Sequence, residues 1–243
     1  MKKDTIIYYI SKEDLEDTNI LFNQIYSNEE CNYYISDDFS PEFYILLAFC
    51  GFITTSFTYQ KKFYLLPEIQ FEYAILDFEN LHISSKVKKL LNKNQYEFKI
   101  NTNFDLVLEN LEKFHKDNWL KDKYKDLILS LVDFKSSKID FQIMSIELYD
   151  KNTNELISGE IGYKIGSTYT SLTGFSSKES IYNNWGKLQL VLLANYLKDN
   201  NFSFWNLGHP YMDYKFDLGA KSFNRMEFLQ RWFNHVNKNL KIN

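Results

Sequence analysis

A histidine follows directly on a short apolar segment in the C-terminal third of the chain. Residues 202–208 predict a buried strand, and His209 comes next, beside Pro210. Open α/β sheets bind their ligands outside the carboxyl ends of their strands, and a histidine at that place can accept a proton from an amine. We therefore predict that His209 is a catalytic residue. The alternative is a histidine in a surface turn.

Basic residues gather in the segment Lys86–Lys93, for which the apolar spacing predicts a short helix. Lys86, Lys89 and Lys93 lie at i, i+3 and i+7 and therefore share one helical face. Such a face either contacts the phosphates of a nucleic-acid backbone or is only exposed to solvent, as most lysine runs are.

The chain has four tryptophans, whose rings are large enough to serve in a core or in a binding site. A tryptophan that lines a cleft stacks on a base or on a bound side chain, whereas most buried tryptophans only pack. Both interpretations are open for Trp119, Trp185, Trp205 and Trp232.

Motifs of several common enzyme classes are missing from the sequence. There is no GxSxG, HExxH, GxxxxGK[ST] or GxGxxG pattern. Enzymes that use acetyl-CoA are expected to hold its pyrophosphate in a glycine-rich turn at a helix start, and the segment Trp185-Gly186-Lys187 has one glycine. Two cysteines without a CxxC pair, together with four histidines, argue against a disulfide framework and a metal centre. We expect no metal and no cofactor.

The elements that must position these residues alternate between strands and helices. Tight turns separate three strands predicted at 141–149, 159–165 and 168–175, which form an antiparallel meander. A helix, a buried strand, a turn, a last strand and a C-terminal helix follow, predicted at 187–198, 202–208, 218–220, 225–229 and around Trp232. This order predicts an α/β (α+β) fold of the acetyltransferase-like (GNAT-like) kind.

The N-terminal part of the chain forms a block of its own. In it, Ser40-Pro41 predicts an N-cap and a proline in the first turn of an apolar helix over 42–51. We predict a small N-terminal α/β domain at residues 1–62 and an acetyltransferase-like domain with the lysine helix at 63–243.

The composition is that of a folded protein without a strong overall charge. Among 243 residues 44% are hydrophobic, which is enough for a sizeable core. The net charge of −4 excludes a polycation that coats nucleic acid, but it allows a local basic patch. No stretch approaches the length of a membrane span, and the first residues lack a signal-peptide cleavage site. We expect a cytoplasmic monomer that does not bind membranes.

Several segments occur in an order that is typical of one enzyme family. They are Asp37-Asp38-Phe39-Ser40-Pro41, Ala74-Ile75-Leu76, Leu81-His82-Ile83-Ser84, Phe175-Ser176, Leu218-Gly219-Ala220-Lys221 and Glu227-Phe228-Leu229. They resemble the G-D-L-S-P, A-V-L, L-H-I-S, M-F-S, L-G-A-R and E-F-L segments of the leucyl/phenylalanyl-tRNA–protein transferase family. The resemblance covers about residues 36–230.

This resemblance implies that an amino acid moves from aminoacyl-tRNA, the co-substrate, to the N-terminal amine of a protein. Such tagging belongs to the N-end rule and leads to protein degradation. The resemblance places a tRNA-binding role on the lysine helix, where the family carries its basic segment, and so favours phosphate binding by Lys86, Lys88, Lys89 and Lys93.

The resemblance also suggests which residues form the substrate pocket and the catalytic site. Trp119 keeps an aromatic position of the family, and we place Phe175 and Trp205 in the same pocket. The family's catalytic D-x-Q strand corresponds to residues 205–209, where we expect Asn206 to orient the nucleophile or the carbonyl and His209 to accept the amine proton.

Two further polar residues follow the predicted catalytic strand. Asp213 and Lys215 either bind the acceptor amine or form an exposed ion pair. The family's G-E-S segment reads Ser171-Leu172-Thr173 here, so that leucine or phenylalanine as the donor does not follow from the resemblance.

Two other functional classes stay open. An acyltransferase of the same fold with another acyl donor would not depend on tRNA, and the altered pocket segments favour it. A tRNA-binding module without catalysis would keep the lysine face alone.

Overall fold

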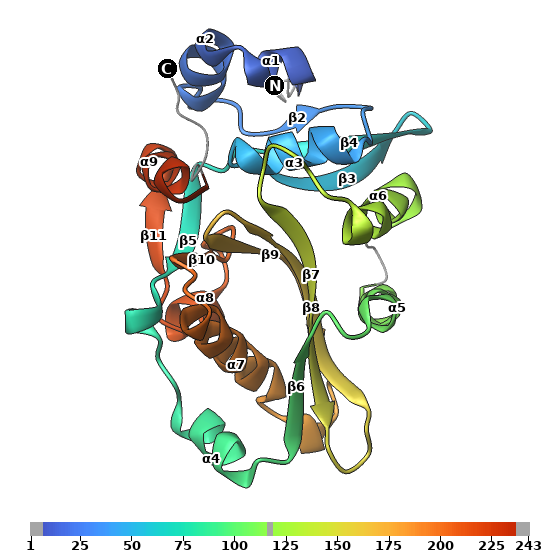
Figure 1. The fold of residues 1–243 in the computed structure, drawn as a ribbon, viewed down its shortest axis with the longest axis vertical. Helices are drawn as coiled ribbons and strands as arrows, with labels where there is room; N and C mark the ends of the chain where they lie inside the picture. The colour runs from blue at the N-terminus through green and yellow to red at the C-terminus, as the bar shows by residue number, and fades with distance from the viewer. Residues whose placement is uncertain (1–6, 116–118, 237–243) are drawn as a thin grey trace, which may run out of the picture.

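A seven-stranded mixed sheet forms the centre of the protein (Figure 1). The computed structural model describes residues 7–115 and 119–236. Across the sheet the order is β11-β5-β10-β9-β8-β7-β6. The strands are β5 (Glu72–Leu76), β6 (Tyr96–Ile100), β7 (Phe141–Asp150), β8 (Leu156–Ile165), β9 (Thr168–Ser176), β10 (Phe204–Asn206) and β11 (Lys221–Asn224). Strands β9 and β10 are parallel, and the other neighbours are antiparallel.

Helices cover both faces of this sheet. The described helices of four or more residues are α1 (Lys12–Glu16), the π-helix Leu21–Tyr26, α3 (Pro41–Phe49), α4 (Ser85–Lys93), α5 (Phe104–Phe114), α6 (Asp122–Asp133), α7 (Trp185–Asp199), α8 (Asp213–Asp217) and α9 (Arg225–Val236). Short α2 (Thr18–Ile20) precedes the π-helix, and the outer strands are β1 (Tyr8–Tyr9), β2 (Tyr34–Ile35), β3 (Ile53–Tyr59) and β4 (Lys62–Glu68).

Alternation along β7 shows how the two faces are filled. Ile143 packs in one core with residues of α5 and α6, whereas its neighbour Met144 packs in a second core with residues of α7. Figure 1 shows α7 and the α5–α6 pair on opposite sides of the strands. Because both faces are covered, β7 is buried almost throughout, including its polar residues Ser145 and Glu147.

The predicted α+β class is confirmed, and so is the meander followed by a helix and a parallel strand. Strands β7, β8 and β9 form the meander, and α7 connects β9 to the parallel strand β10. The predicted cap is also present: Ser40 accepts from the Phe43 amide, and Ser84 caps α4 in the same way by accepting from the Val87 amide.

The strand predicted at residues 225–229 is wrong, because Arg225 begins helix α9. The Asn224 side chain accepts from the Glu227 amide, and the Glu227 side chain accepts from the Asn224 amide, each at 3.0 Å. This reciprocal cap ends β11 and starts the helix. Buried Phe228, Leu229 and Trp232 then follow with helical spacing.

The predicted domain boundary at residues 62 and 63 falls at the start of β4. Strands β3 and β4 pair along their whole length, from Ile53 with Glu68 to Tyr59 with Lys62. One hydrophobic core also contains Phe43, Tyr124 and Phe228, which lie on both sides of the boundary. Any division that keeps the hairpin intact therefore lies before Ile53 or beyond Glu68, and the two domains themselves stay a prediction.

Arg225 joins the N-terminal block to the main sheet. Its side chain is 5% exposed, and within the described residues its guanidinium donates hydrogen bonds to backbone carbonyls alone. These carbonyls belong to Ile25, Tyr26, Asn28, Cys31, Ile69 and Gln70. One arginine thus donates to backbone carbonyls at the end of the π-helix and in two loops, which lie outside the hydrogen-bonded strands.

Replacing Arg225 by methionine should lower the free energy of unfolding by at least about 3 kcal/mol, because several buried carbonyls lose their donor at about 1–3 kcal/mol each. Urea denaturation measures the change. Lys221→Met is the control, since Lys221 is exposed on β11 and surface substitutions change stability by about 0.5 kcal/mol or less. Equal effects of the two changes would contradict this role of Arg225.

Candidate active site

A cavity of about 540 Å³ opens between β8, β9, α7 and the segment that follows β10. Its size lies within the range of about 300–1,000 Å³ that is usual for small-molecule sites. The walls include Trp119, Leu172, Phe175, Leu190 and Met212. Polar groups also line it, contributed by Glu160, Ser171, Gln189, Tyr214 and Lys215.

Trp119 and Phe175, two residues predicted for the substrate pocket, lie in the wall of this cavity. The Trp119 ring stands edge-on to Tyr124, with centroids 5.2 Å apart. The Phe175 ring stacks on Phe114 at 5.1 Å. Both aromatic faces are therefore held in place by further rings.

Trp205 lies one layer behind the cavity. It is fully buried on β10 against the α7 side of the sheet. Its indole N–H donates to Ser171 Oγ at 2.9 Å, and Ser171 lines the cavity. Trp205 therefore orients a cavity residue instead of forming the wall itself.

Lys215 is buried in the cavity wall, contrary to an exposed ion pair with Asp213. The lysine is 6% exposed, and its Nζ donates to Leu207 O at 2.5 Å and to His209 O at 2.6 Å. Burial lowers the pKa of Lys215 to about 8. Asp213 is exposed at the start of α8, and no ion pair joins it to Lys215 in the described parts of the chain.

Asn206 holds the turn that presents these carbonyls to Lys215. It is 1% exposed, and its Oδ1 accepts from the Gly208 amide at 2.9 Å. Gly208 has a φ of +73°, in the left-handed region that favours glycine. The neighbouring Leu207 lines the cavity, whereas the Asn206 side chain is committed to the turn.

The imidazole of His209 lies outside the cavity wall. Its Nε2 is 2.8 Å from Glu68 Oε2, and its ring stacks on Tyr211. Glu68 is buried and also accepts from Asn32. The structure therefore brings the backbone carbonyl of His209 to the site, through Lys215, and pairs its side chain with a carboxylate of the N-terminal block.

Glu160 is a polar residue of the site that sequence reasoning missed. It is 4% exposed in β8, and its Oε1 accepts from Tyr169 Oη at 3.0 Å and from Ser171 Oγ at 2.9 Å. Burial raises the pKa of Glu160 to about 7, against the opposing effect of these two hydrogen bonds. A single glutamate inside an otherwise buried strand was the available signal.

Replacing Glu160 by glutamine should remove a pH dependence of stability. Because the folded protein holds this proton more tightly, its stability falls as the pH rises from about 4.5 to about 7. The variant should be more stable than the parent above pH 7, by up to about 3 kcal/mol, and equally stable near pH 4. Urea denaturation at several pH values between about 4 and about 8 measures the free energy of unfolding. If this free energy depends on pH in the same way in both proteins, the raised pKa of Glu160 is contradicted.

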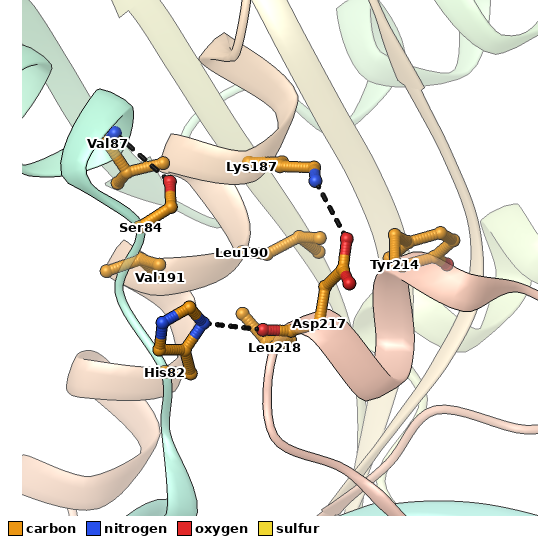
Figure 2. A pocket seen from close by; sticks show the side chains of 9 residues that line it. All are labelled: His82, Ser84, Val87, Lys187, Leu190, Val191, Tyr214, Asp217 and Leu218. Carbon is orange, nitrogen blue, oxygen red and sulfur yellow. Dashed lines mark hydrogen bonds and ion pairs between the residues drawn. The ribbon is translucent and has the colours of Figure 1, made fainter.

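A smaller pocket lies between the large cavity and α4 (Figure 2). Lys187, Leu190 and Tyr214 line both cavities. In the smaller one Lys187 pairs with Asp217 at 3.1 Å, and His82 Nδ1 lies 2.9 Å from Asp217 O (Figure 2). The two cavities are therefore neighbours that share one wall.

Two of the segments that carried the resemblance meet at this pocket. The His82 amide donates to Leu218 O at 2.9 Å. Gly219 has a φ of +108°, and a Cβ there would lie 2.0 Å from Asn80 O. Only glycine allows this close approach, which explains why the L-G-A turn and the L-H-I-S segment occur together.

The four lysines predicted to bind tRNA are exposed on α4. Val87 anchors the helix in the core, and α4 packs beside α7. Among the described residues, none of these lysines forms an ion pair. Lys86 lies in the first helical turn, where the helix dipole disfavours a cation. We define the α4 lysines as Lys86, Lys88, Lys89 and Lys93.

The chain matches the model of the leucyl/phenylalanyl-tRNA protein transferase family over residues 75–232. It belongs to this family. The matched part contains all residues that line the large cavity, together with α4. The family resemblance seen in the sequence is confirmed, and neither an acyltransferase with another donor nor a module without catalysis is favoured.

Individual relatives are similar at modest identity. The leucyl/phenylalanyl-tRNA–protein transferase of Flavobacterium johnsoniae is 24% identical over 159 residues, 64% of this chain and 69% of the relative. That of Tolumonas auensis is 23% identical over 202 residues, 81% of this chain and 79% of the relative. Among solved structures, L-PGS from Bacillus licheniformis is similar at a TM-score of 0.46 and 11% identity, covering 88% of this chain and 64% of that one.

In residues 7–115 and 119–236 no helix is long and apolar enough to cross a membrane. No group of three or more His, Cys, Asp or Glu side chains in this part of the protein is arranged to hold a metal ion.

Proposed function

We propose that this chain transfers an amino acid from charged tRNA to the N-terminal amine of a protein, in the cavity between β8, β9 and α7. The observation that supports this most is the cavity itself, which lies wholly within the part of the chain that matches the transferase family. In this proposal the protein acts as a monomer, and charged tRNA is its only co-substrate.

The reaction is the attack of an amine on an ester. The amine nitrogen bonds to the carbonyl carbon, the bond from that carbon to the ribose oxygen breaks, and the amine proton is lost while the ribose oxygen gains one. Negative charge develops on the carbonyl oxygen, so that a fixed donor beside it lowers the barrier.

Lys215 is suited to stabilise this charge. An ammonium has three N–H donors, and two of those of Lys215 are occupied by Leu207 O and His209 O. The third is available to the substrate in the cavity that Lys215 lines. Because two carbonyls fix the ammonium, little reorganisation is needed when the charge develops.

Asn206 and His209 take supporting roles in this proposal. Asn206 holds the turn at Gly208 and is a positioning residue for Lys215. His209 contributes its carbonyl to the same lysine, and its imidazole, paired with Glu68 outside the cavity wall, is a candidate to receive a proton released from the site.

Transfer of radiolabelled amino acids from a total charged tRNA pool tests the proposed function. The acceptors are peptides with basic, acidic and apolar N-termini, with and without ribonuclease. We expect label on at least one peptide, and its loss after ribonuclease treatment. Charged tRNA that binds without any transfer, or transfer that resists ribonuclease, would contradict the proposal.

A further inference from the structure

The polar end of the large cavity has more hydrogen-bond acceptors than donors. Glu160 Oε1 accepts from two hydroxyl groups, but the closest donor to Oε2 is Gln189 Nε2 at 3.5 Å. Gln189 is 2% exposed on α7, and its Oε1 is buried without a hydrogen-bond partner among the described residues. Both residues line the cavity.

The orientation of the Gln189 amide follows from its neighbour. When Glu160 is ionised, a turned-over amide would place its oxygen against the carboxylate oxygen of Glu160, and two acceptors would meet. The unpaired oxygen of Gln189 is therefore a property of the ionised site. A buried acceptor without a donor costs about 1–3 kcal/mol, which a ligand with donors at this place would recover.

In the described part of the chain no ion pair to Glu160 is formed. Two N–H groups of Lys215 donate to Leu207 O and His209 O, and Lys187 pairs with Asp217. His115, which also lines the cavity, has its Nε2 2.9 Å from Gly174 O.

A buried carboxylate is costly unless a cation compensates it, and the carboxyl of Glu160 therefore holds its proton more tightly than usual, with its pKa raised to about 7. A cationic group of a ligand would take the place of that proton and compensate the charge.

The cavity also suits the rest of a long basic side chain. Leu172, Phe175 and Leu190 provide apolar surface in the same cavity wall. Lysine and arginine bury their methylene stems along apolar surface and place the charged group at a polar site. Leucine or phenylalanine would fill the apolar part but leave both acceptors without donors.

We infer that this site selects a donor amino acid with a basic side chain, lysine or arginine, and that Glu160 is its specificity-determining residue. The inference rests on the proposed aminoacyl transfer. An α-ammonium group bound at Glu160 would be the competing arrangement, but every amino acid carries that group, and it would produce no preference among donors.

The first experiment uses the full chain and one tRNA body acylated in turn with lysine, arginine, leucine and phenylalanine, so that the tRNA contributes equally to all four. We expect kcat/KM for lysine or arginine to exceed that for leucine and phenylalanine by at least about 100-fold, or two steps of tenfold at about 1.4 kcal/mol each. Equal rates, or a preference for leucine or phenylalanine, would overturn the inference and leave the proposed function intact. Transfer of none of the four, nor of any amino acid from the total pool, would contradict both.

The second experiment removes the charge and keeps the shape. In Glu160→Gln an amide oxygen still accepts from Tyr169 and Ser171. We expect the preference for basic over apolar donors to fall at least about tenfold, mostly because kcat/KM for the basic donors falls. Glu147→Gln is the matched control. Glu147 is a fully buried carboxylate on β7 that accepts from Ser145 and Tyr149 and does not line the cavity. An equal change of preference in both variants would overturn the assignment.

Discussion

Lys215→Met should lower the rate of amino acid transfer about 100- to 1,000-fold, the usual effect of removing one donor from an oxyanion site. Methionine fills a similar volume without charge or N–H groups, so that the developing charge loses its fixed donor. Single-turnover transfer with saturating charged tRNA measures the effect. Binding of the tRNA should change little, because the α4 lysines are elsewhere on the protein.

The pH profile separates this role of Lys215 from a structural one. The acceptor amine has to be neutral and has a pKa near about 7.7–8.0, whereas the Lys215 ammonium, with its pKa lowered to about 8, has to stay charged. Transfer should therefore rise towards pH 8 and fall above it, and the residual activity of Lys215→Met should keep the rise and lose the fall.

The control for Lys215 is Lys198→Met, at the exposed end of α7. This change removes a lysine of the same charge away from the cavity and should leave the rate within about twofold of the parent, as surface changes commonly do. Two results would exclude Lys215 as the charge-stabilising group. In the first, Lys215→Met keeps most of its activity. In the second, the decrease in rate above about pH 8 disappears only under conditions in which the variant is also unfolded.

The parts of the fold that follow from local residues were predictable. Ser40 accepts from the amide three residues on, as predicted, and the helix predicted at Lys86–Lys93 is α4, Ser85–Lys93. The start of α9 was missed although its signal is local too: Asn224 and Glu227 have the spacing of a reciprocal cap. The sequence analysis placed a strand there, whereas Phe228, Leu229 and Trp232 are buried with the spacing of a helix.

The sequence predicted several residues that lie at the candidate site, but not the hydrogen bonds that these residues form. Trp119, Phe175 and Lys215 do line one cavity. His209 does not, because its ring is held by Glu68, which lies 141 positions earlier in the chain. A hydrogen bond between residues so far apart in the chain produces no periodic pattern in the sequence from which it could be predicted. A glutamate in a buried strand is unusual in the sequence, but the place of Glu160 in the site follows only from its contacts with Ser171 and Gln189.

Replacing all four α4 lysines by glutamine should weaken binding of charged tRNA roughly 100- to 1,000-fold at about 0.1 M salt. Each lysine that contacts a phosphate releases about one counterion, so that the slope of log K against log salt should become shallower by about 3 to 4. Glutamine has nearly the helix propensity of lysine, and Val87 still anchors the helix. Titration of labelled tRNA at several salt concentrations measures both quantities.

The matched control for the α4 lysines changes four exposed lysines around α6, which lies in the upper half of Figure 1, away from α4 near the bottom. They are Lys121, Lys123, Lys135 and Lys138. Both variants lose four positive charges and move the net charge from −4 to −8, so that long-range attraction of tRNA weakens equally in both. Only direct phosphate contact predicts a larger loss of affinity and of salt dependence for the α4 variant. Equal losses would mean that the α4 lysines act through net charge alone and that tRNA binds on another face.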